Sequence, residues 1–338
     1  MPLIPSDSSS ESDIMKSRFD PLRPVVWGAA LALSVAALLA DPAQFPPAAR
    51  TTIGPFATLA GLIAGGIVAD RLGVFRGLAR VLIPSRASSR LAFAAVLVFT
   101  AALSGLVNLD VAVVVALPVA LRVARGAGLS ASRLCIAIAL TANAASFLLP
   151  TSNLTTLLIL SRIPLAPWTY LRESWAAWLL VCGATICGLT LLLARRHEKN
   201  AGGRTVRPLT IQALLDLGPL FVCASALRAL LGAGVTLPGH FLAELMTGSL
   251  VAACVNNLPA AAAVHAAGTS EAWAAILAMA IGPNLIVTGS IATLICRRLA
   301  RDDAVQFSFA TFSLLGLVLV PVELLAAGVG LLATGVLR

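Results

Sequence analysis

Long apolar runs, separated by short polar turns, fill the chain after residue 24. The runs fall at 25–40, 53–69, 91–121, 134–161, 175–194, 211–231, 241–266, 273–296 and 305–335. They are rich in Ala and Leu and do not alternate with polar residues, so they predict helices and not the strands of a barrel. A spanning helix needs about 20 residues. The pattern therefore predicts an all-α polytopic membrane protein, with residues 1–24 as a polar cytosolic tail.

Two of the runs combine an unusual length with a polar centre. The 91–121 run is too long for one untilted crossing and too short for two full ones, and Asn108-Leu109-Asp110 interrupts it. The 241–266 run has the same build around Asn256-Asn257-Leu258-Pro259. Each run is predicted to form a re-entrant hairpin that turns at mid-membrane. The alternative is one long, tilted and kinked helix in each place.

The placement of basic residues favours the hairpins. With two hairpins and a cytosolic N-terminus, 19 of the 24 Lys and Arg residues fall in the predicted inner segments. These segments are 1–24, 70–90, 122–133, 195–210 and 297–304. A full crossing at 91–121 would place Arg86 and Arg90 on the opposite side from Arg122 and Arg125, against the positive-inside rule. We therefore expect a bacterial cytoplasmic (inner) membrane protein with its C-terminus outside.

Composition agrees with this class. The chain is 59% apolar and only 12% charged, which leaves too little charge for the shell of a soluble protein of this size. The net charge of +9 comes from the basic turns, so we do not expect nucleic acid as a partner. The six cysteines lie in apolar runs without CxxC spacing, which indicates apolar packing. A thiol site for a soft metal or metalloid is the alternative.

Two polar interruptions in the first half of the chain are echoed in the second half. Residues 107–112 resemble 255–260, and residues 150–157 resemble 287–294. Polar groups at membrane depth are expensive, and matched breaks in two halves indicate a secondary transporter built from an inverted repeat. The predicted repeats are 25–162, with a broken span at 134–161, and 175–298, with a cytosolic linker at 195–210 and a broken span at 273–296. A final transmembrane helix lies within 305–338.

Two hairpin tips and two broken spans would meet around a small polar chamber. Helix ends exposed there present amides to anions and carbonyls to cations. Gly282-Pro283 and Gly289 would allow the backbone to unwind. The residues predicted to bind the solute are Asn108, Thr151, Ser152, Asn153, Asn256, Asn257, Asn284, Thr288, Gly289 and Ser290.

Two acids inside apolar runs are candidates for coupling transport to an ion. Asp110 lies beside the first tip, and Glu323 follows Pro321 in the last run. Either could bind a proton or sodium, and the alternative for each is a hydrogen-bonded structural acid. The sequence has no nucleotide-binding loop, metal-ligand cluster or other enzyme signature, so we expect no catalysis and no cofactor besides the coupling ion. An ATP-driven pump would need a separate ATPase subunit.

The second tip and the second break carry a resemblance to a known group of proteins. Residues 282–294 resemble the GPN…GS…ATLL run of the ArsB-type arsenite permeases, and Asn256-Asn257-Leu258-Pro259 resembles their hairpin tip. These permeases belong to the ion-transporter superfamily, with the sodium/proton antiporters and the divalent-anion/sodium symporters. The resemblance covers roughly residues 50–335. The first tip departs from it, because the family's Asn-Asp pair is replaced by Asn108-Leu109-Asp110.

The resemblance implies proton-coupled efflux of arsenite and antimonite as neutral hydroxides. The Asn, Ser and Thr side chains of the chamber suit such a solute. Within the same superfamily, the alternatives are a sodium/proton antiporter and a sodium- or proton-coupled anion symporter of the dicarboxylate type. A membrane scaffold subunit without transport is the alternative from another class. Related symporters dimerise, so a homodimer is also open, with the lipid bilayer as the certain partner.

Overall fold

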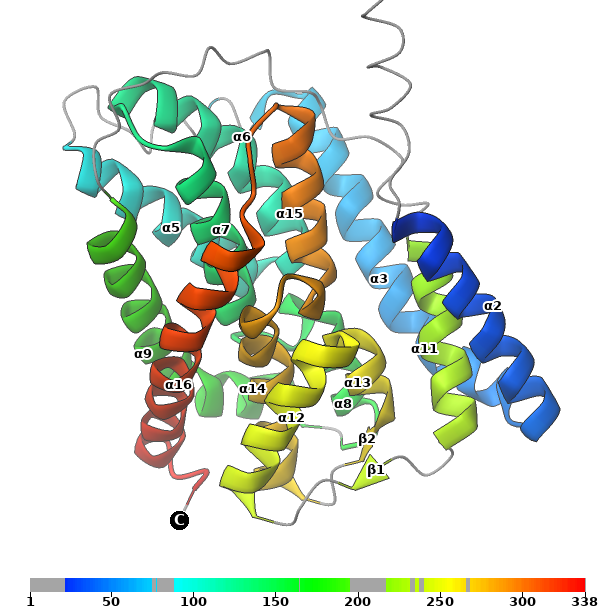
Figure 1. The fold of residues 1–338 in the computed structure, drawn as a ribbon. Coiled ribbons are helices and arrows are strands. Elements are labelled where there is room, and N and C mark those ends of the chain that lie inside the picture. The colour runs from blue at the N-terminus through cyan, green and yellow to red at the C-terminus, as the bar shows by residue number, and fades with distance from the viewer. Residues whose placement is uncertain are drawn as a thin grey trace, which may run out of the picture.

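The computed structural model describes residues 22–74, 77, 88–163, 165–194, 217–231, 235–236, 240–265 and 268–337. Its helices are α2 (Leu22–Ala40), α3 (Phe45–Arg71), α5 (Ser89–Leu106), α6 (Leu109–Ala127), α7 (Ala131–Ala144), α8 (Leu154–Leu160), α9 (Pro167–Leu193), α11 (Leu217–Leu231), α12 (Phe241–Val255), α13 (Asn257–Ala263), α14 (Thr269–Ile281), α15 (Ile291–Asp302) and α16 (Phe309–Ala333) (Figure 1). The prediction of a helical chain is confirmed. Among the described residues, the strands are a parallel pair of two residues each, β1 (Val235–Thr236) and β2 (Val264–His265). The predicted tail and the 195–210 linker lie almost wholly outside the described residues.

Several helices have the composition of membrane spans. Among the described residues, α5, α9 and α16 are long and apolar enough to cross a membrane, and α7 and α12 are shorter apolar helices. Large apolar side chains such as Leu191 on α9 and Leu325 on α16 are about 70% exposed. A soluble protein rarely exposes so many of them together, whereas lipid solvates them. The chain is therefore a multi-pass membrane protein.

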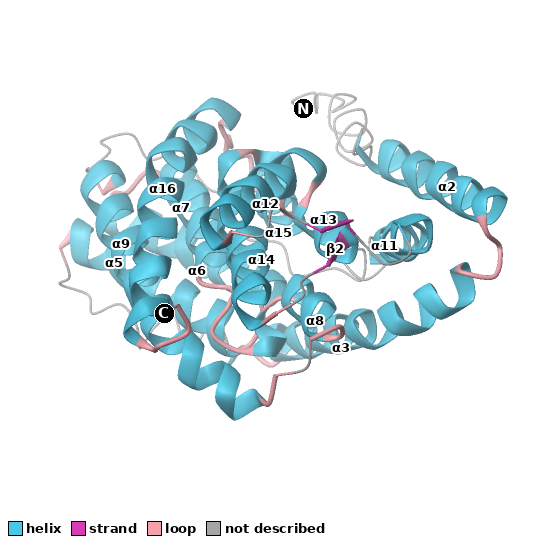
Figure 2. Ribbon diagram, turned by 90° about the horizontal axis from the view of Figure 1, so that it is seen from below, coloured by secondary structure: helices cyan, strands magenta, loops and turns pink. Residues whose placement is uncertain are grey.

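Three helices form a layer of their own. Helix α11 packs against α2 and α3, and Figures 1 and 2 show these three helices together on one side, with α9 and α16 on the other side. The hydroxyl oxygens of Thr52 on α3 and Ser225 on α11 lie 2.9 Å apart in this layer. Helices α9 and α16 make an extensive contact, and Gly330 permits it because a Cβ there would lie 2.2 Å from the Cα of Ala177.

Two pairs of consecutive helices turn at the predicted tips. Helices α5 and α6 pack against each other and are joined only by Val107 and Asn108. Helices α12 and α13 also contact each other and are joined by Asn256. The first pair extends beyond the 91–121 run, from Ser89 to Ala127, because Ser88 and Gly128 cap the two outer ends.

Two helices are interrupted where breaks are predicted. Between α7 and α8 lies the 3-10 turn η1 (Pro150–Ser152), and between α14 and α15 lie η2 (Gly282–Leu285) and η3 (Val287–Gly289). Asn153 and Ser290, which cap the helices after the breaks, share an extended backbone, with φ of −144° and −137°. Gly282 allows the second break to pack on α12, because a Cβ there would lie 2.5 Å from the Cα of Ser249.

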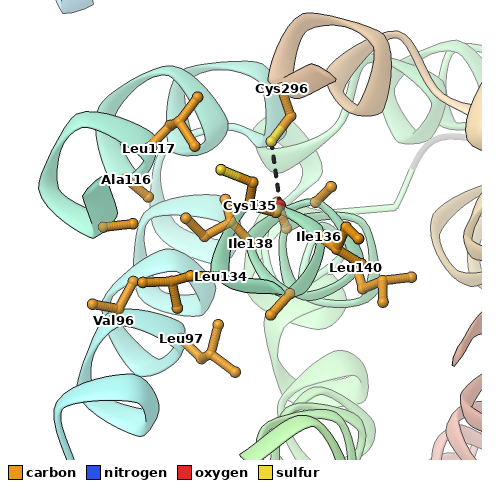
Figure 3. Packing of buried hydrophobic residues seen from close by; sticks show 14 of the residues in the cluster. Val96, Leu97, Ala116, Leu117, Leu134, Cys135, Ile136, Ile138, Leu140 and Cys296 are labelled. Atoms are coloured by element: carbon orange, nitrogen blue, oxygen red, sulfur yellow. Dashed lines mark hydrogen bonds between the residues drawn. The ribbon is translucent and has the colours of Figure 1, made fainter. Parts of the chain in front are cut away.

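The largest apolar core joins α5, α6 and α7 (Figure 3). Val96 and Leu97 of α5 pack with Ala116 and Leu117 of α6 around a fully buried stretch of α7 that includes Leu134. Cys135 and Cys296 belong to this core, and the Cys296 thiol donates to the carbonyl oxygen of Cys135 at 3.4 Å. These two cysteines are packing residues, which agrees with the expectation from their apolar surroundings.

Candidate solute site at the helix breaks

A small cavity lies where the tips and breaks from both halves of the chain meet. It has room for about one water molecule or one small ion in this conformation. Its wall consists of the first residues of α6, α8, α13 and α15, together with two residues that cap them. The lining residues are Leu109, Asp110, Asn153, Leu154, Thr155, Asn257, Leu258, Ser290 and Ile291. Four helix N-termini therefore converge on the cavity.

Three of these four helix starts are capped by asparagine. The backbone amide of Asp110 donates to Oδ1 of Asn108 at 2.9 Å, and that of Thr155 donates to Oδ1 of Asn153 at 3.0 Å. The amide of Leu258 donates to Oδ1 of Asn256 at 3.2 Å. Ser290 occupies the same position before α15 but makes no capping hydrogen bond. The start of α15 is thus the end that keeps its positive partial charge without a side-chain cap.

Two hydroxyls in the cavity wall have no hydrogen-bond partner. Ser290 is 1% exposed and Thr155 is 2% exposed, and neither hydroxyl oxygen is bonded to another group. Buried hydroxyls in folded proteins nearly always have a partner. Asp110, which is 8% exposed, adds a carboxyl to the same wall. A carboxyl and two unpartnered hydroxyls around one cavity form a polar site of the kind that a ligand completes.

Each tip asparagine also bonds to the break in its own half. Nδ2 of Asn108 donates to the carbonyl oxygen of Thr151 at 3.3 Å, and Nδ2 of Asn256 donates to that of Thr288 at 2.9 Å. Thr151 and Thr288 are the central residues of η1 and η3. The tips differ in backbone, because Asn256 has a φ of 90°, in the left-handed region, whereas Asn108 is extended.

The structure brings together only part of the predicted binding set. Asn153, Asn257 and Ser290 line the cavity, as does Asp110. Asn108, Asn256, Thr151 and Thr288 form the two tip-to-break bonds around it, the threonines through carbonyl oxygens while their side chains are exposed. Ser152, Asn284, Gly289 and Glu323 lie outside the cavity wall.

These four outlying residues have structural partners. The Ser152 hydroxyl donates to the carbonyl oxygen of Leu149 at 2.5 Å. Gly289 packs on Pro283, where a Cβ would lie 2.8 Å from the Cα of Pro283. Asn284 donates to the carbonyl oxygen of Leu140 at 3.0 Å, and Glu323 accepts a bond from Thr185 at 2.7 Å.

Several residues around the site were not predicted from the sequence. Thr155 follows Asn153 by two positions, and this spacing after a capping residue is the signal that could have identified it. Asn143 and Thr185 lie inside apolar runs, and each bonds to a side chain more than a hundred positions away. Arg162 donates to the carbonyl oxygens of Ala262 and Val264, which ties the far end of α8 to the far end of α13.

A family model described as Citrate transporter (CitMHS) matches residues 22–336. The chain belongs to the citrate transporter family. This family is part of the ion-transporter superfamily, so the resemblance is confirmed at that level, and its members are secondary transporters of small solutes and not enzymes. The comparison with curated proteins found no match.

Proposed function

We propose that this chain is a proton-coupled secondary transporter of a small carboxylate, one carboxylate group of which binds in the cavity between the tips and the breaks. The observation that carries the proposal is the convergence of four helix N-termini on one cavity, with the α15 start uncapped and Asp110 in the wall. Helix N-termini attract anions, and transporters place such ends at mid-membrane solute sites. Membership of the citrate transporter family supports the choice of a carboxylate.

We further propose that the chain is an inverted repeat with two re-entrant hairpins, α5–α6 and α12–α13. The matched bonds from Asn108 to Thr151 and from Asn256 to Thr288 support this, since each half repeats one arrangement of tip and break. In the bacterial inner membrane, with a cytosolic N-terminus, the basic turns would face the cytosol. The α5–α6 tip would then approach the cavity from inside and the α12–α13 tip from outside.

Asp110 provides the physical reason for coupling. An ionised Asp110 and a bound carboxylate would place two like charges together in a region of low dielectric constant, which is strongly unfavourable. A proton on Asp110 removes the repulsion, so the solute and the proton bind together. Sodium would neutralise the same carboxylate and would find oxygen ligands in Thr155 and Ser290, which keeps sodium as the second candidate for the coupling ion.

Arsenite or antimonite efflux is the second candidate function. It is favoured by the resemblance of residues 282–294 to the arsenite permeases and by the absence of basic residues among those described around the cavity. A neutral hydroxide could bond to the free hydroxyls of Thr155 and Ser290. In that case protons would drive the solute outward by exchange. A sodium/proton antiporter would use the same cavity for sodium alone.

Flux into proteoliposomes distinguishes these functions. The purified full chain is reconstituted, a pH gradient is imposed, and uptake of labelled citrate, arsenite and sodium is compared. We expect citrate to accumulate on the side to which protons flow, and Asp110→Asn to abolish the effect of the gradient. Arsenite or sodium moving against the proton flow, with no citrate uptake, would overturn the carboxylate proposal and select one of the alternatives.

A further inference from the structure

Glu323 is a carboxyl buried in the middle of α16, away from the cavity. It is fully buried, and its oxygens accept hydrogen bonds from two neutral donors. The Thr185 hydroxyl donates to Oε1 at 2.7 Å, and Nδ2 of Asn284 donates to Oε2 at 3.4 Å. A charged carboxylate with only neutral partners at this depth is expensive, so binding of a proton is the inexpensive way to stabilise it.

A continuous chain of polar groups leads from Glu323 to the cavity. Oδ1 of Asn284 accepts a bond from Nδ2 of Asn143 at 3.0 Å, which links the second break to the end of α7. The carbonyl oxygen of Asn143 accepts from Ser146 at 2.7 Å, and the Ser146 hydroxyl accepts from Nδ2 of Asn153 at 2.9 Å. Asn153 caps α8 and lines the cavity. The polar chain therefore joins α16 to both breaks.

Two of the three asparagine amides in this polar chain use both of their hydrogens. Asn284 donates to Glu323 and to the carbonyl oxygen of Leu140, and Asn143 donates to Asn284 and to the Thr293 hydroxyl at 3.0 Å. Neither side chain can exchange one partner without losing a buried hydrogen bond. A change at one end is therefore passed along the polar chain.

The Thr185 hydroxyl can serve Glu323 in either protonation state. Its oxygen lies 2.7 Å from Oε1 of Glu323 and 2.8 Å from the carbonyl oxygen of Val181, but it has a single hydrogen. With Glu323 ionised, that hydrogen points to the carboxylate. With Glu323 protonated, the acid donates to Thr185, whose own hydrogen turns to Val181. The Glu323 carboxyl can take up a proton without leaving an unsatisfied group behind.

The other titratable and charged groups on the helices around Glu323 are a thiol and residues far from the polar chain. The Cys182 thiol on α9 faces the carboxyl. The charged residues on α7, α9 and α14 lie at the far ends of these helices. Arg133 on α7, Arg172 and Glu173 on α9, and Glu271 on α14 are each ten or more residues from the polar chain, or about 15 Å along the helix. Arg297 on α15 is stacked on Phe309, at the start of α16.

Helix α16 also contacts the second break through its backbone. A Cβ at Gly316 would lie 1.8 Å from the carbonyl oxygen of Asn284, so only glycine permits this approach. Gly316 and Glu323 are two turns apart on the same helix. Asn284 is thus held by α16 at two points, and a shift of the Glu323 side chain acts directly on η2.

We propose that Glu323 is a second proton-binding group and a positioning residue, which sets the geometry of both breaks through Asn284 and Asn143. It does not touch the solute. The proposal rests on the proposed function only in taking the cavity at Asn153 as the solute site. When Glu323 loses its proton, the hydrogen bond from Asn284 to the carboxylate becomes stronger. The resulting shift of Asn284 is transmitted through the polar chain to the segment 146–155.

Hydrogen exchange of the full chain in lipid vesicles tests this without any solute. We expect the protection factor of residues 146–155, which is the intrinsic exchange rate divided by the observed rate, to change roughly three- to tenfold between about pH 5 and about pH 9, since the strength of about one hydrogen bond is altered. Glu323→Gln, which keeps the size and polarity of the side chain, should make the protection factor independent of pH. The measurements are made in an Asp110→Asn background, because Asp110 lines the cavity beside Asn153 and its own ionisation would otherwise contribute to the pH dependence.

Infrared difference spectra and the Thr185 variants complete the test. The band of a protonated carboxyl that remains in Asp110→Asn should disappear when Glu323→Gln is added. Thr185→Val should change the midpoint of the exchange profile, and Thr185→Ser, which retains the hydroxyl, should restore it. A pH profile of residues 146–155 that is unchanged by Glu323→Gln would overturn the proposal. Because no transport is measured, that result would leave the proposed function standing.

Discussion

Nδ2 of Asn256 lies 2.9 Å from the carbonyl oxygen of Thr288, and this bond joins the tip of one helix pair to the break in the next helix. The same side chain caps α13 through its oxygen. Asn108 does both in the first half, with Thr151 as its partner. In each half, the tip asparagine therefore bonds to the break of the same half. The cavity forms where the two halves meet.

Replacement of Asn256 tests these two hydrogen bonds. Asn256→Ala removes the cap and the tie to Thr288, and we expect a loss of about 1–2 kcal/mol in stability and at least about a tenfold loss of uptake. Thr288→Ala is the matched control, because Thr288 contributes its backbone carbonyl and its exposed side chain is not needed. Thermal unfolding in detergent and uptake into vesicles measure the two effects. Equal losses in both variants would contradict this role of Asn256.

Asp110→Asn tests the electrostatic basis of coupling. In the parent protein, lower pH on the side of uptake protonates Asp110, removes the repulsion and increases carboxylate uptake. Higher pH ionises Asp110 and decreases it. The asparagine variant has no charge to lose, so its uptake should be nearly independent of pH. The measurement is the initial rate of citrate uptake against pH, and an unchanged slope in the variant would assign the proton to another group.

The unpartnered hydroxyls predict that binding and stability respond differently. Ser290→Ala and Thr155→Val remove buried groups that lack a partner, so we expect stability to stay the same or to rise by up to about 1 kcal/mol. If the hydroxyls bind the solute, KM should rise roughly tenfold, since each loses about one hydrogen bond. Thr155→Ser should retain the parent KM. A fall in stability with an unchanged KM would mean that the hydroxyls support the fold and not the solute.

Gly282 predicts a steric limit at the second break. In Gly282→Ala the new Cβ would lie 2.5 Å from the Cα of Ser249 on α12. Overpacking against backbone should cost about 1–3 kcal/mol or more. Gly183→Ala, on α9 with no atom within 4 Å of its Cβ position, is the control and should be neutral or slightly stabilising. The comparison of their unfolding temperatures decides the point.

The helices and their interruptions could be predicted because those signals are local. An asparagine, a proline or a glycine inside an apolar run marks a break wherever the chain later packs, and Asn108, Asn256, Pro150 and Gly282 all lie at such breaks. The residues that share the cavity were predicted less completely. Asn153 and Ser290 line it, but Asn284 lies behind it, because its orientation depends on Asn143, which is 141 positions away.

Two further features, Thr155 and the partner of Glu323, could not be predicted from the sequence for the same reason. Thr155 occupies the first turn of α8 and appears in the sequence as one more threonine in an apolar run. Glu323 stands out in the sequence as an acid inside an apolar run, yet its partner Thr185 lies on a helix 138 positions earlier. Side-chain contacts over such separations depend on how helices pack, which the pattern of a single sequence does not contain.

The convergence of helix ends on the cavity also determines which states of the carrier are close to electrical neutrality. Of the four helix starts, those of the two longer helices, α6 and α15, supply about half a positive charge each, which an ionised Asp110 balances when the cavity is empty. With a proton on Asp110 and one carboxylate group in the cavity, the sum is again close to zero. A proton alone or a carboxylate alone leaves a net charge, which the low dielectric of a membrane penalises. Under the proposed function, the carrier would therefore cross between its two faces either empty or fully loaded, and the ion gradient would not leak away through it.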